Sequence, residues 1–176
     1  MRMKQKKVWI LSGVPGSGKS TWVKEQIAKN GGVHCSRDEI RFSLLKDDED
    51  YFARELDVIN IWHNKVVEAI LDPEVENIYI DATHLNEKAR KKTLKALPKG
   101  DYVVTFVFFD VPLETCIKRN DNRTGRAFVP RSVIRRMHAC YDQNTKLGDA
   151  TLHLDENGEW RATLHLDENG EWRGID

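Results

Sequence analysis

The sequence predicts an α/β protein in which helices flank a parallel β-sheet, and two patterns carry that prediction. Short apolar runs alternate with segments of helical periodicity along the chain, as expected for a parallel sheet. The run VVTFVFF at residues 103–109 has almost no polar interruption. Such a run is typical of a strand that is covered on both faces.

The expected elements follow in order along the chain. We expect strands at residues 8–12, 33–36, 78–81 and 103–109. We expect helices at residues 18–29, 51–71, 86–97, 112–121 and 130–145. In the second helix, residues at steps of three and four predict one buried stripe, formed by Phe52, Leu56, Ile59, His63, Val66 and Ile70. Pro130 suits the first turn of the last helix.

Composition limits the class of protein. At 176 residues the chain is long enough for one domain with a sizeable core. Its 28 basic and 28 acidic residues cancel, which excludes a uniformly basic nucleic-acid coat but leaves room for a local basic patch. Cys35, Cys116 and Cys140 have no metal or disulfide spacing, so we expect free thiols in the cytoplasm. No segment has the length of a membrane span.

A glycine-rich motif follows the first expected strand. Residues 13–20 read GVPGSGKS and match G-x-x-x-x-G-K-[ST], with a strand before and a helix after them. Lys19 is expected to reach the β- and γ-phosphates of a nucleotide, and Ser20 to ligate Mg²⁺. The residues expected to bind the nucleotide here are Gly13, Gly16, Ser17, Gly18, Lys19, Ser20 and Thr21. A P-loop kinase fold is therefore predicted, with ATP and Mg²⁺ as cofactors.

The segment SRDEIR lies at the end of the second strand, where parallel sheets form ligand crevices. A hydroxyl that attacks a γ-phosphate must lose its proton, and Asp38 is placed to accept it. Arg41, one helical turn later, lies on the same side and can bind an anionic group of the acceptor. The alternative is that Asp38 caps a helix whose surface Glu39 and Arg41 solvate.

Asp81 ends the third strand at the position of a Walker-B acid. In that role it holds Mg²⁺ with Ser20 or through a water. The alternative is a cap for the helix that begins near Asn86. His84 is expected to be a polar loop residue rather than a catalyst.

An arginine-rich segment, KRNDNRTGRAFVPRSVIRR, follows the fourth strand. The Thr124-Gly125 pair interrupts it, so we expect a helix–loop–helix lid at about residues 118–131. Arg119 and Arg123 are the expected contacts to the donor phosphates, where guanidinium groups stabilise developing charge. Arg131 and Arg135, about one turn apart, fit a groove that follows a nucleic-acid backbone.

These motifs together resemble a known family. GVPGSGKSTW, SRDEIR, IDATHLN and FFDVPLETCIKRNDNR…VP are similar to the kinase module of bacteriophage and bacterial 5′-hydroxyl polynucleotide kinases, from about residue 8 to residue 147. The resemblance implies transfer of phosphate from ATP to the 5′-OH end of DNA or RNA. It also implies Lys19 and Ser20 on ATP and Mg²⁺, Asp38 as general base, Arg41 on the acceptor phosphate, and Arg119 and Arg123 on the donor.

The chain departs from the family pattern at two points. Ala82 stands where the phage pattern has Asp, with Asp81 one step earlier, and the lid is one residue longer between Arg123 and Pro130. No D-x-D-x-T/V phosphatase motif accompanies the kinase motifs. Two other functions stay open: a P-loop kinase of a small-molecule hydroxyl such as a nucleoside, sugar or antibiotic, and a nucleotide-binding module without transfer.

The C-terminal tail contains a tandem duplication. ATLHLDENGEWR occurs at residues 150–161 and again at 162–173. Each Asp-Glu-Asn-Gly fits a type I turn, and the residues between the turns alternate as in a strand with one apolar face. We therefore expect a kinase domain at 1–148 and a β-meander tail at 149–176. Its apolar face must be covered by the kinase domain or by a second chain, as in a homo-oligomer.

Overall fold

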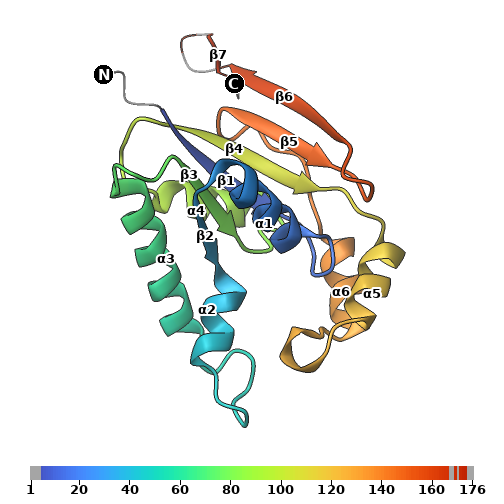
Figure 1. The fold of residues 1–176 in the computed structure, drawn as a ribbon. Coiled ribbons are helices and arrows are strands. Elements are labelled where there is room, and N and C mark those ends of the chain that lie inside the picture. The colour runs from blue at the N-terminus through green and yellow to red at the C-terminus, as the bar shows by residue number, and fades with distance from the viewer. Residues whose placement is uncertain (1–4, 167–168, 170, 174–176) are drawn as a thin grey trace.

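The chain folds as a mostly parallel sheet with helices on both faces (Figure 1). The structure is a computed structural model and describes residues 5–166, 169 and 171–173. Within those residues the sheet has seven strands in the order β2-β3-β1-β4-β5-β6-β7. The strands are β1 Lys6–Ser12, β2 Val33–Ser36, β3 Asn77–Asp81, β4 Tyr102–Phe109, β5 Ala150–Leu154, β6 Trp160–Leu166 and β7 Trp172–Arg173. The helices are α1 Lys19–Asn30, α2 Arg37–Leu44, α3 Glu55–Leu71, α4 Glu87–Ala96, α5 Leu113–Asp121, the short 3₁₀ helix η1 Gly125–Ala127, and α6 Arg131–Ala139.

The alternation of side chains along the central strands divides the core between two helical layers. Val8 and Ile10 of β1 pack in one cluster with α2, α3 and α4, whereas Leu11 packs in the other cluster with α1, α5 and α6. β4 repeats the pattern, because Phe106 belongs to the first cluster and Val107 to the second. Both clusters are buried, which confirms the prediction that this strand is covered on both faces.

The prediction for α3 was right about the helix and about the burial of Val66 and Ile70, and wrong about the start of the helix and the first residues of its buried face. The helix begins at Glu55, because residues 51–54 form turns. Phe52 and Leu56, both expected inside, are 63% and 78% exposed. The buried residues of α3 are Val58, Trp62, Val66, Ala69 and Ile70. The Trp62 indole donates a hydrogen bond to the Cys35 carbonyl on β2 at 2.8 Å, so this large ring determines which face turns inward.

The last predicted helix is shorter than expected and ends at Ala139 rather than near residue 145. Beyond it the Tyr141 hydroxyl donates to the Ser12 carbonyl at 2.6 Å, and the Asp142 amide donates to the Leu85 carbonyl at 2.9 Å. These bonds hold residues 141 and 142 at the carboxyl end of the sheet. The chain then runs back toward the start of β4, where the Asp149 amide donates to the Val104 carbonyl at 2.8 Å, and continues as β5 in parallel with β4.

The segment between β4 and β5 has the helix–loop–helix form predicted for it. α5 and α6 flank the loop, in which Gly125 has a φ of 60°. The buried Asn120 amide closes the loop, because it donates to the Val129 carbonyl at 2.7 Å and accepts from the Val129 amide at 2.9 Å. Figure 1 shows α5 and α6 on one side of the molecule and α2 and α3 on the other, with the β1–α1 loop between the two pairs.

The sheet continues through residue 148, where the sequence analysis placed a domain boundary. β5, the first strand of the duplicated segment, pairs in parallel with β4, so it lies within the same sheet. β6 then returns antiparallel to β5 through the turn at residues 155–158, in which Gly158 has a φ of 77°. The expected second turn, at residues 167–170, includes Asp167, Glu168 and Gly170, which lie outside the described residues.

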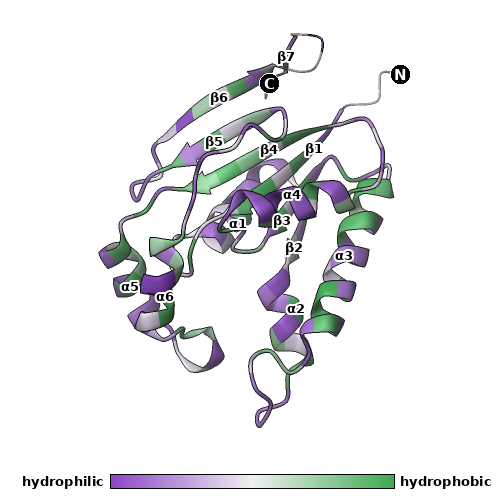
Figure 2. Cartoon of the chain, turned by 180° about the vertical axis from the view of Figure 1, so that it is seen from behind, coloured by the Kyte–Doolittle hydropathy of each residue, from purple (hydrophilic) through white to green (hydrophobic). Residues whose placement is uncertain are grey.

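The second copy of the duplication repeats the pairing of the first copy. Leu154 pairs with Trp160, and twelve residues later Leu166 pairs with Trp172. The apolar face of β6 remains exposed at two large side chains: Trp160 is 67% and Leu164 is 41% exposed. Figure 2 shows this outer strand alternating between hydrophobic and hydrophilic residues.

Across the described ranges 5–166, 169 and 171–173, no helix combines the length and the apolar character needed to cross a bilayer.

Deleting Ala162–Arg173 tests how far the second copy stabilises the fold. The deletion joins Arg161 to Gly174, so that Gly174, Ile175 and Asp176 take the places of Ala162, Thr163 and Leu164 opposite β5. We expect the free energy of unfolding to fall by roughly 1–2 kcal/mol, since partly exposed apolar side chains are lost. Thermal unfolding should then show a midpoint lower by about 2–8 °C. An unchanged midpoint would mean that β6 adds no stability to β5.

Candidate active site

The P-loop joins β1 to α1 and places backbone N–H groups at the start of that helix. Gly16 and Gly18 have φ values of 84° and 97°, a region that L side chains rarely adopt. Gly18 occupies the N-cap position and no side chain caps the helix, so the first N–H groups of α1 remain available to a phosphate. Ser20 and Thr21 both lie exposed on the first turn of α1.

Lys19 folds back over this loop. Its ammonium group donates to the Gly13 carbonyl at 2.8 Å and to the Val14 carbonyl at 3.2 Å. Burial lowers the pKa of Lys19, while the carboxylates of Asp81 and Asp38 act to raise it. A phosphate bound in the loop would give this buried cation a direct counter-ion.

Ser17 leaves a buried hydroxyl in the same loop. It is 3% exposed, and its Oγ has no hydrogen-bond partner among the described residues. A Cβ at Gly13 would lie 2.7 Å from that Oγ, so only glycine fits beside it without displacing the serine. An unpaired buried hydroxyl is costly, and an oxygen of a bound nucleotide would satisfy it. The loop therefore fits the phosphates of ATP.

Ser20 and Asp81, predicted as metal ligands, are brought together. The Ser20 hydroxyl donates to Asp81 Oδ2 at 3.0 Å, and His34 Nε2 lies 2.8 Å from the same oxygen. Burial would raise the pKa of Asp81, but the hydrogen bond from His34 and the charge of Lys19 outweigh it, so the pKa is lowered. Asp81 is therefore a buried carboxylate rather than a carboxylic acid.

This oxygen pair fits Mg²⁺. The ion prefers hard oxygen ligands and commonly takes one or two from protein, with the others from water and substrate phosphates. The described part of the chain contains no group of three or more His, Cys, Asp or Glu side chains suited to hold a metal ion. An ion beside Ser20 and Asp81 would thus depend on nucleotide oxygens and would neutralise phosphate charge when bound.

Asp38 lies on α2, across the P-loop from the lid. The cap of α2 is Ser36, whose Oγ accepts from the Glu39 amide at 3.2 Å, so the alternative of Asp38 as the helix cap is wrong. Asp38 Oδ1 instead accepts from Arg41 and from the Tyr51 hydroxyl, the latter at 2.8 Å. The cap proposed for Asp81 is also filled by another residue, since Asn86 caps α4. Asp38 is 61% exposed and open to an acceptor.

Arg41 is far more enclosed than the sequence suggested. Its side chain is only 5% exposed and bonds Glu55 at 2.7 Å as well as Asp38. Burial would lower the pKa of Arg41, but the hydrogen bond to Glu55 and the charges near it raise it. Arg41 also stacks on the Tyr51 ring, 4.4 Å from its centroid. Sequence reasoning missed Tyr51 and Glu55, which lie 10 and 14 positions beyond Arg41 and come near only through the turn into α3.

Of the two arginines predicted to bind the donor phosphates, the lid brings Arg119 into contact with the P-loop. Arg119 Nη1 lies 3.5 Å from the Gly16 carbonyl and 3.3 Å from the Ser17 carbonyl. Arg123 donates to the Ala127 carbonyl within the lid, and its positive charge acts to lower the pKa of Lys19. Helix α5 packs directly on the loop, because a Cβ at Gly16 would lie 2.3 Å from the Cys116 carbonyl.

The other arginines of the lid have different surroundings. Arg126 crosses to the segment after α2, where it donates to the Lys46 carbonyl and lies 3.9 Å from Asp47. Arg131 forms a two-point ion pair with Asp121, at 3.1 and 2.6 Å. Arg135 is exposed on α6. Of the two residues predicted to follow a nucleic-acid backbone, Arg131 is thus already paired with a carboxylate.

Two buried polar residues, His84 and Arg90, support the site through hydrogen bonds to backbone carbonyls. The His84 ring donates from Nδ1 to the Leu11 carbonyl at 2.6 Å, which leaves Nε2 to accept from the Thr93 hydroxyl at 2.9 Å. Arg90, which sequence reasoning missed, is fully buried and donates to the carbonyls of His84 and Asp142. Its place on α4 gave no sign of this, because the surrounding EKARKK reads as a solvated helix.

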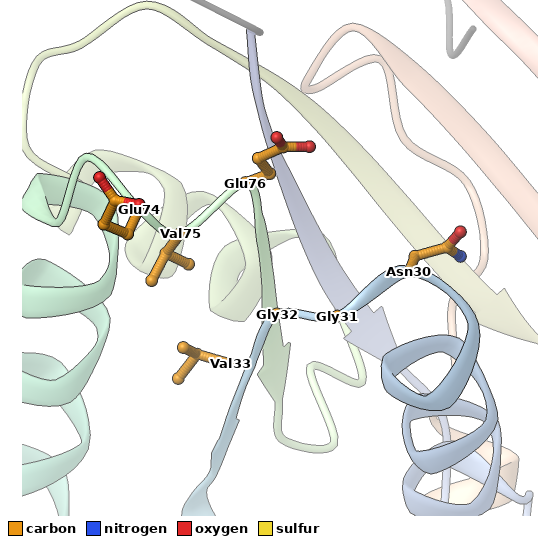
Figure 3. A pocket seen from close by; sticks show the side chains of 7 residues that line it. All are labelled: Asn30, Gly31, Gly32, Val33, Glu74, Val75 and Glu76. Atoms are coloured by element: carbon orange, nitrogen blue, oxygen red, sulfur yellow. The ribbon is translucent and has the colours of Figure 1, made fainter.

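A separate hollow lies at the other end of the strands. Figure 3 shows the residues that line it, on the α1–β2 turn at residues 30–33 and on the turn at residues 74–76. The volume of the hollow is about 410 Å³. These turns precede β2 and β3, whereas ligands of parallel sheets bind beyond the carboxyl ends of the strands. The hollow is therefore not part of the phosphate-binding site.

Comparison with known families agrees with this geometry. A family model described as an AAA domain matches residues 8–143, which is most of the chain. The chain belongs to this family. The match spans the P-loop, Asp38, Asp81 and the lid, and it ends before β5.

Solved structures share the kinase-like P-loop fold. The "Pnkp1/Rnl/Hen1 RNA repair complex" includes a chain 27% identical to this one, with a TM-score of 0.66 over 79% of this chain and 45% of that chain. A gluconokinase from Sinorhizobium meliloti 1021 is 20% identical, with a TM-score of 0.54 over 88% and 84%. A putative kinase from Chloroflexus aurantiacus is 13% identical, with a TM-score of 0.66 over 88% and 87%. The chain thus spans less than half of the RNA-repair chain that it matches.

The buried His84 predicts a pH dependence of stability. Burial lowers its pKa to about 4, below the value of about 6.5 in an unfolded chain. Between these values the unfolded state binds the proton more readily, so stability is full above pH 6.5 and falls as the pH drops toward 4, by up to roughly 3 kcal/mol. Chemical denaturation at a series of pH values measures this loss.

The matched variant is His84→Asn, which keeps a donor for the Leu11 carbonyl and tolerates the φ of 41° at this position. We expect it to flatten the decline below pH 6.5. His63→Asn removes a histidine of α3 that lies outside this network and should leave the decline in place. Equal slopes for the original chain and His84→Asn would show that another group causes the pH dependence.

Proposed function

We propose that the chain transfers the γ-phosphate of ATP to the 5′-hydroxyl end of DNA or RNA. The observation that carries the proposal is the pairing of a donor side and an acceptor side across the P-loop. Lys19, Arg119 and Arg123 form the donor side, and within the described residues their hydrogen bonds go to backbone carbonyls rather than to carboxylates. Asp38 supplies an exposed carboxylate on the acceptor side, and its negative charge acts to raise the pKa of Lys19.

The difference in partners supports the assignment of donor residues. A cation loses less interaction energy when it exchanges a neutral carbonyl for a phosphate than when it exchanges a carboxylate. The reason is that a hydrogen bond between two charged groups is stronger than one to a neutral acceptor. Lys19 and Arg119 can therefore turn to the phosphates of ATP at low cost. Arg41 and Arg131 are held by carboxylates, so an acceptor phosphate must compete with Glu55 or Asp121 for them.

The proposed reaction is an in-line displacement. The acceptor oxygen forms a bond to the γ-phosphorus, the bond from that phosphorus to the β,γ-bridging oxygen breaks, and ADP leaves. The proton of the acceptor hydroxyl passes to Asp38. Ser20 and Asp81 would hold Mg²⁺, which supplies charge neutralisation at the phosphates.

The choice of polynucleotide as acceptor rests on two supports. The motifs SRDEIR and FFDVPLETCIKRNDNR resemble those of 5′-hydroxyl polynucleotide kinases, and 27% identity links the chain to a component of an RNA repair complex. We further propose that a second copy of the chain covers the exposed apolar face of β6, at Trp160 and Leu164.

One observation favours a small-molecule acceptor as the second candidate. Residues 47–50 read DDED and follow α2 on the acceptor side, where they would repel a polyanion. Arg126 of the lid contacts the start of this acidic segment, at the Lys46 carbonyl and at Asp47. A sugar or nucleoside hydroxyl would meet less of this charge.

Incubation with γ-labelled ATP separates the two candidates. We expect label on 5′-OH DNA or RNA oligonucleotides in the presence of Mg²⁺, and none after addition of excess chelator, because Ser20 and Asp81 cannot replace the ion. Nucleosides, gluconate and 5′-phosphorylated oligonucleotides serve as comparison acceptors. Label on gluconate or a nucleoside, with none on the 5′-OH oligonucleotides, would establish the small-molecule kinase instead.

Replacing the proposed base tests the acceptor side. Asp38→Asn should lower turnover by roughly 10²–10⁴-fold, the usual contribution of a general base, and should leave ATP affinity nearly unchanged. Asp57→Asn is the matched control, because Asp57 is 60% exposed and also lies near an arginine three positions away. Steady-state kinetics at saturating ATP gives the comparison. Normal turnover of Asp38→Asn would mean that another group accepts the proton.

A further inference from the structure

Hydrogen bonds of Asp155 fix the conformation of the turn between β5 and β6. Asp155 Oδ1 accepts from the amides of Asn157 and Glu159, both at 2.9 Å. The Gly158 amide donates to the Asp155 carbonyl at 3.2 Å, and the Asp155 amide to the Glu159 carbonyl at 3.0 Å. These four bonds fix the direction in which Glu156, at the tip of the turn, points.

Glu156 holds two successive turns of α5. Its carboxylate accepts from the Thr115 hydroxyl at 2.7 Å, and its carbonyl accepts from Arg119 Nη2 at 3.0 Å. Thr115 and Arg119 are four positions apart and so lie on one face of the helix. The turn thus bonds both the helix that carries Arg119 and the guanidinium group itself.

The other side of the same guanidinium lies on the P-loop. Arg119 Nη1 contacts the carbonyls of Gly16 and Ser17, at 3.5 and 3.3 Å. A Cβ at Gly18 would lie 3.5 Å from that nitrogen. Arg119 therefore bridges the phosphate-binding loop and the tip of the β5–β6 turn, which come from opposite ends of the chain.

We infer that Glu156 is a positioning residue for the donor site: it orients Arg119 toward the phosphates of ATP. The inference rests on the proposed contact of Arg119 with the nucleotide. It assigns to the first copy of the duplicated segment a role in nucleotide binding, in addition to its place in the sheet. Without the Thr115 bond, α5 loses a contact that fixes its rotation, and the guanidinium samples other positions beside the P-loop.

The affinity for MgATP of single and double variants tests this role. Glu156→Ala should weaken MgATP binding by about 3- to 10-fold, the effect of one hydrogen bond, with a smaller change in kcat at saturating ATP. Glu156→Gln keeps an oxygen that can accept from Thr115 and should recover most of the affinity. In an Arg119→Ala background, Glu156→Ala should have no further effect. Titration calorimetry gives the dissociation constants, and thermal unfolding shows whether each variant is folded.

Glu168→Ala is the matched control, since Glu168 has the same neighbours in the second copy of the sequence, and it should leave MgATP affinity unchanged. Full MgATP affinity in Glu156→Ala would overturn the inference, as would an equal loss with and without Arg119. An Arg119→Ala variant of normal affinity would overturn it too. If the affinities follow the expected pattern while no 5′-OH oligonucleotide is labelled, the positioning role stands and the proposed acceptor is wrong.

Discussion

Hydrogen bonds from buried polar groups hold the carboxyl end of β1, and the phosphate-binding loop depends on them. The carbonyl of Leu11 accepts from His84, the carbonyl of Ser12 accepts from Tyr141, and the amide of Gly13 donates to the Thr83 carbonyl at 2.9 Å. Three consecutive residues are thereby fixed to the β3–α4 loop and to the segment after α6. Because the loop begins at the last of these residues, its position relative to Asp81 and to the lid is set by the same bonds.

Much of the fold and part of the site follow from local sequence. A nearly unbroken apolar strand and a phosphate-loop motif predict the parallel sheet and the place of Lys19. For the acid at the end of β3 the sequence left a helix cap as the alternative, and the structure decides it, because Asn86 caps α4 and Asp81 accepts from Ser20. The partners of Arg41 could not be, because Tyr51 and Glu55 reach it only through a turn with no periodic pattern. The buried face of α3 was predicted only in part, at Val66 and Ile70, because Phe52 and Leu56 match the helical period as well as Trp62 does.

Buried Arg90 shows a further limit of sequence reasoning. Its neighbours on α4 are charged, so a position beneath the sheet was not apparent, yet it donates to the carbonyls of His84, Asp142 and Asn144 and lies 5.0 Å from the centre of the Phe108 ring. Carbonyls of an extended segment need donors when they are buried. The requirement arises from the tertiary path of residues 141–147, and no local pattern in α4 encodes it.

The twelve-residue spacing of the duplication has an evolutionary consequence. One unit contains one strand and one turn, so the pairing Leu154–Trp160 is reproduced as Leu166–Trp172 without a shift of register. A tandem copying event of this length lengthens an antiparallel edge and leaves every earlier hydrogen bond of the sheet unchanged. An insertion of an odd number of residues within the strand would place apolar side chains on the opposite face. The outer edge of this fold is thus a site at which new backbone can be gained in whole units during gene divergence, while the parallel strands that carry the phosphate loop stay under their original constraints.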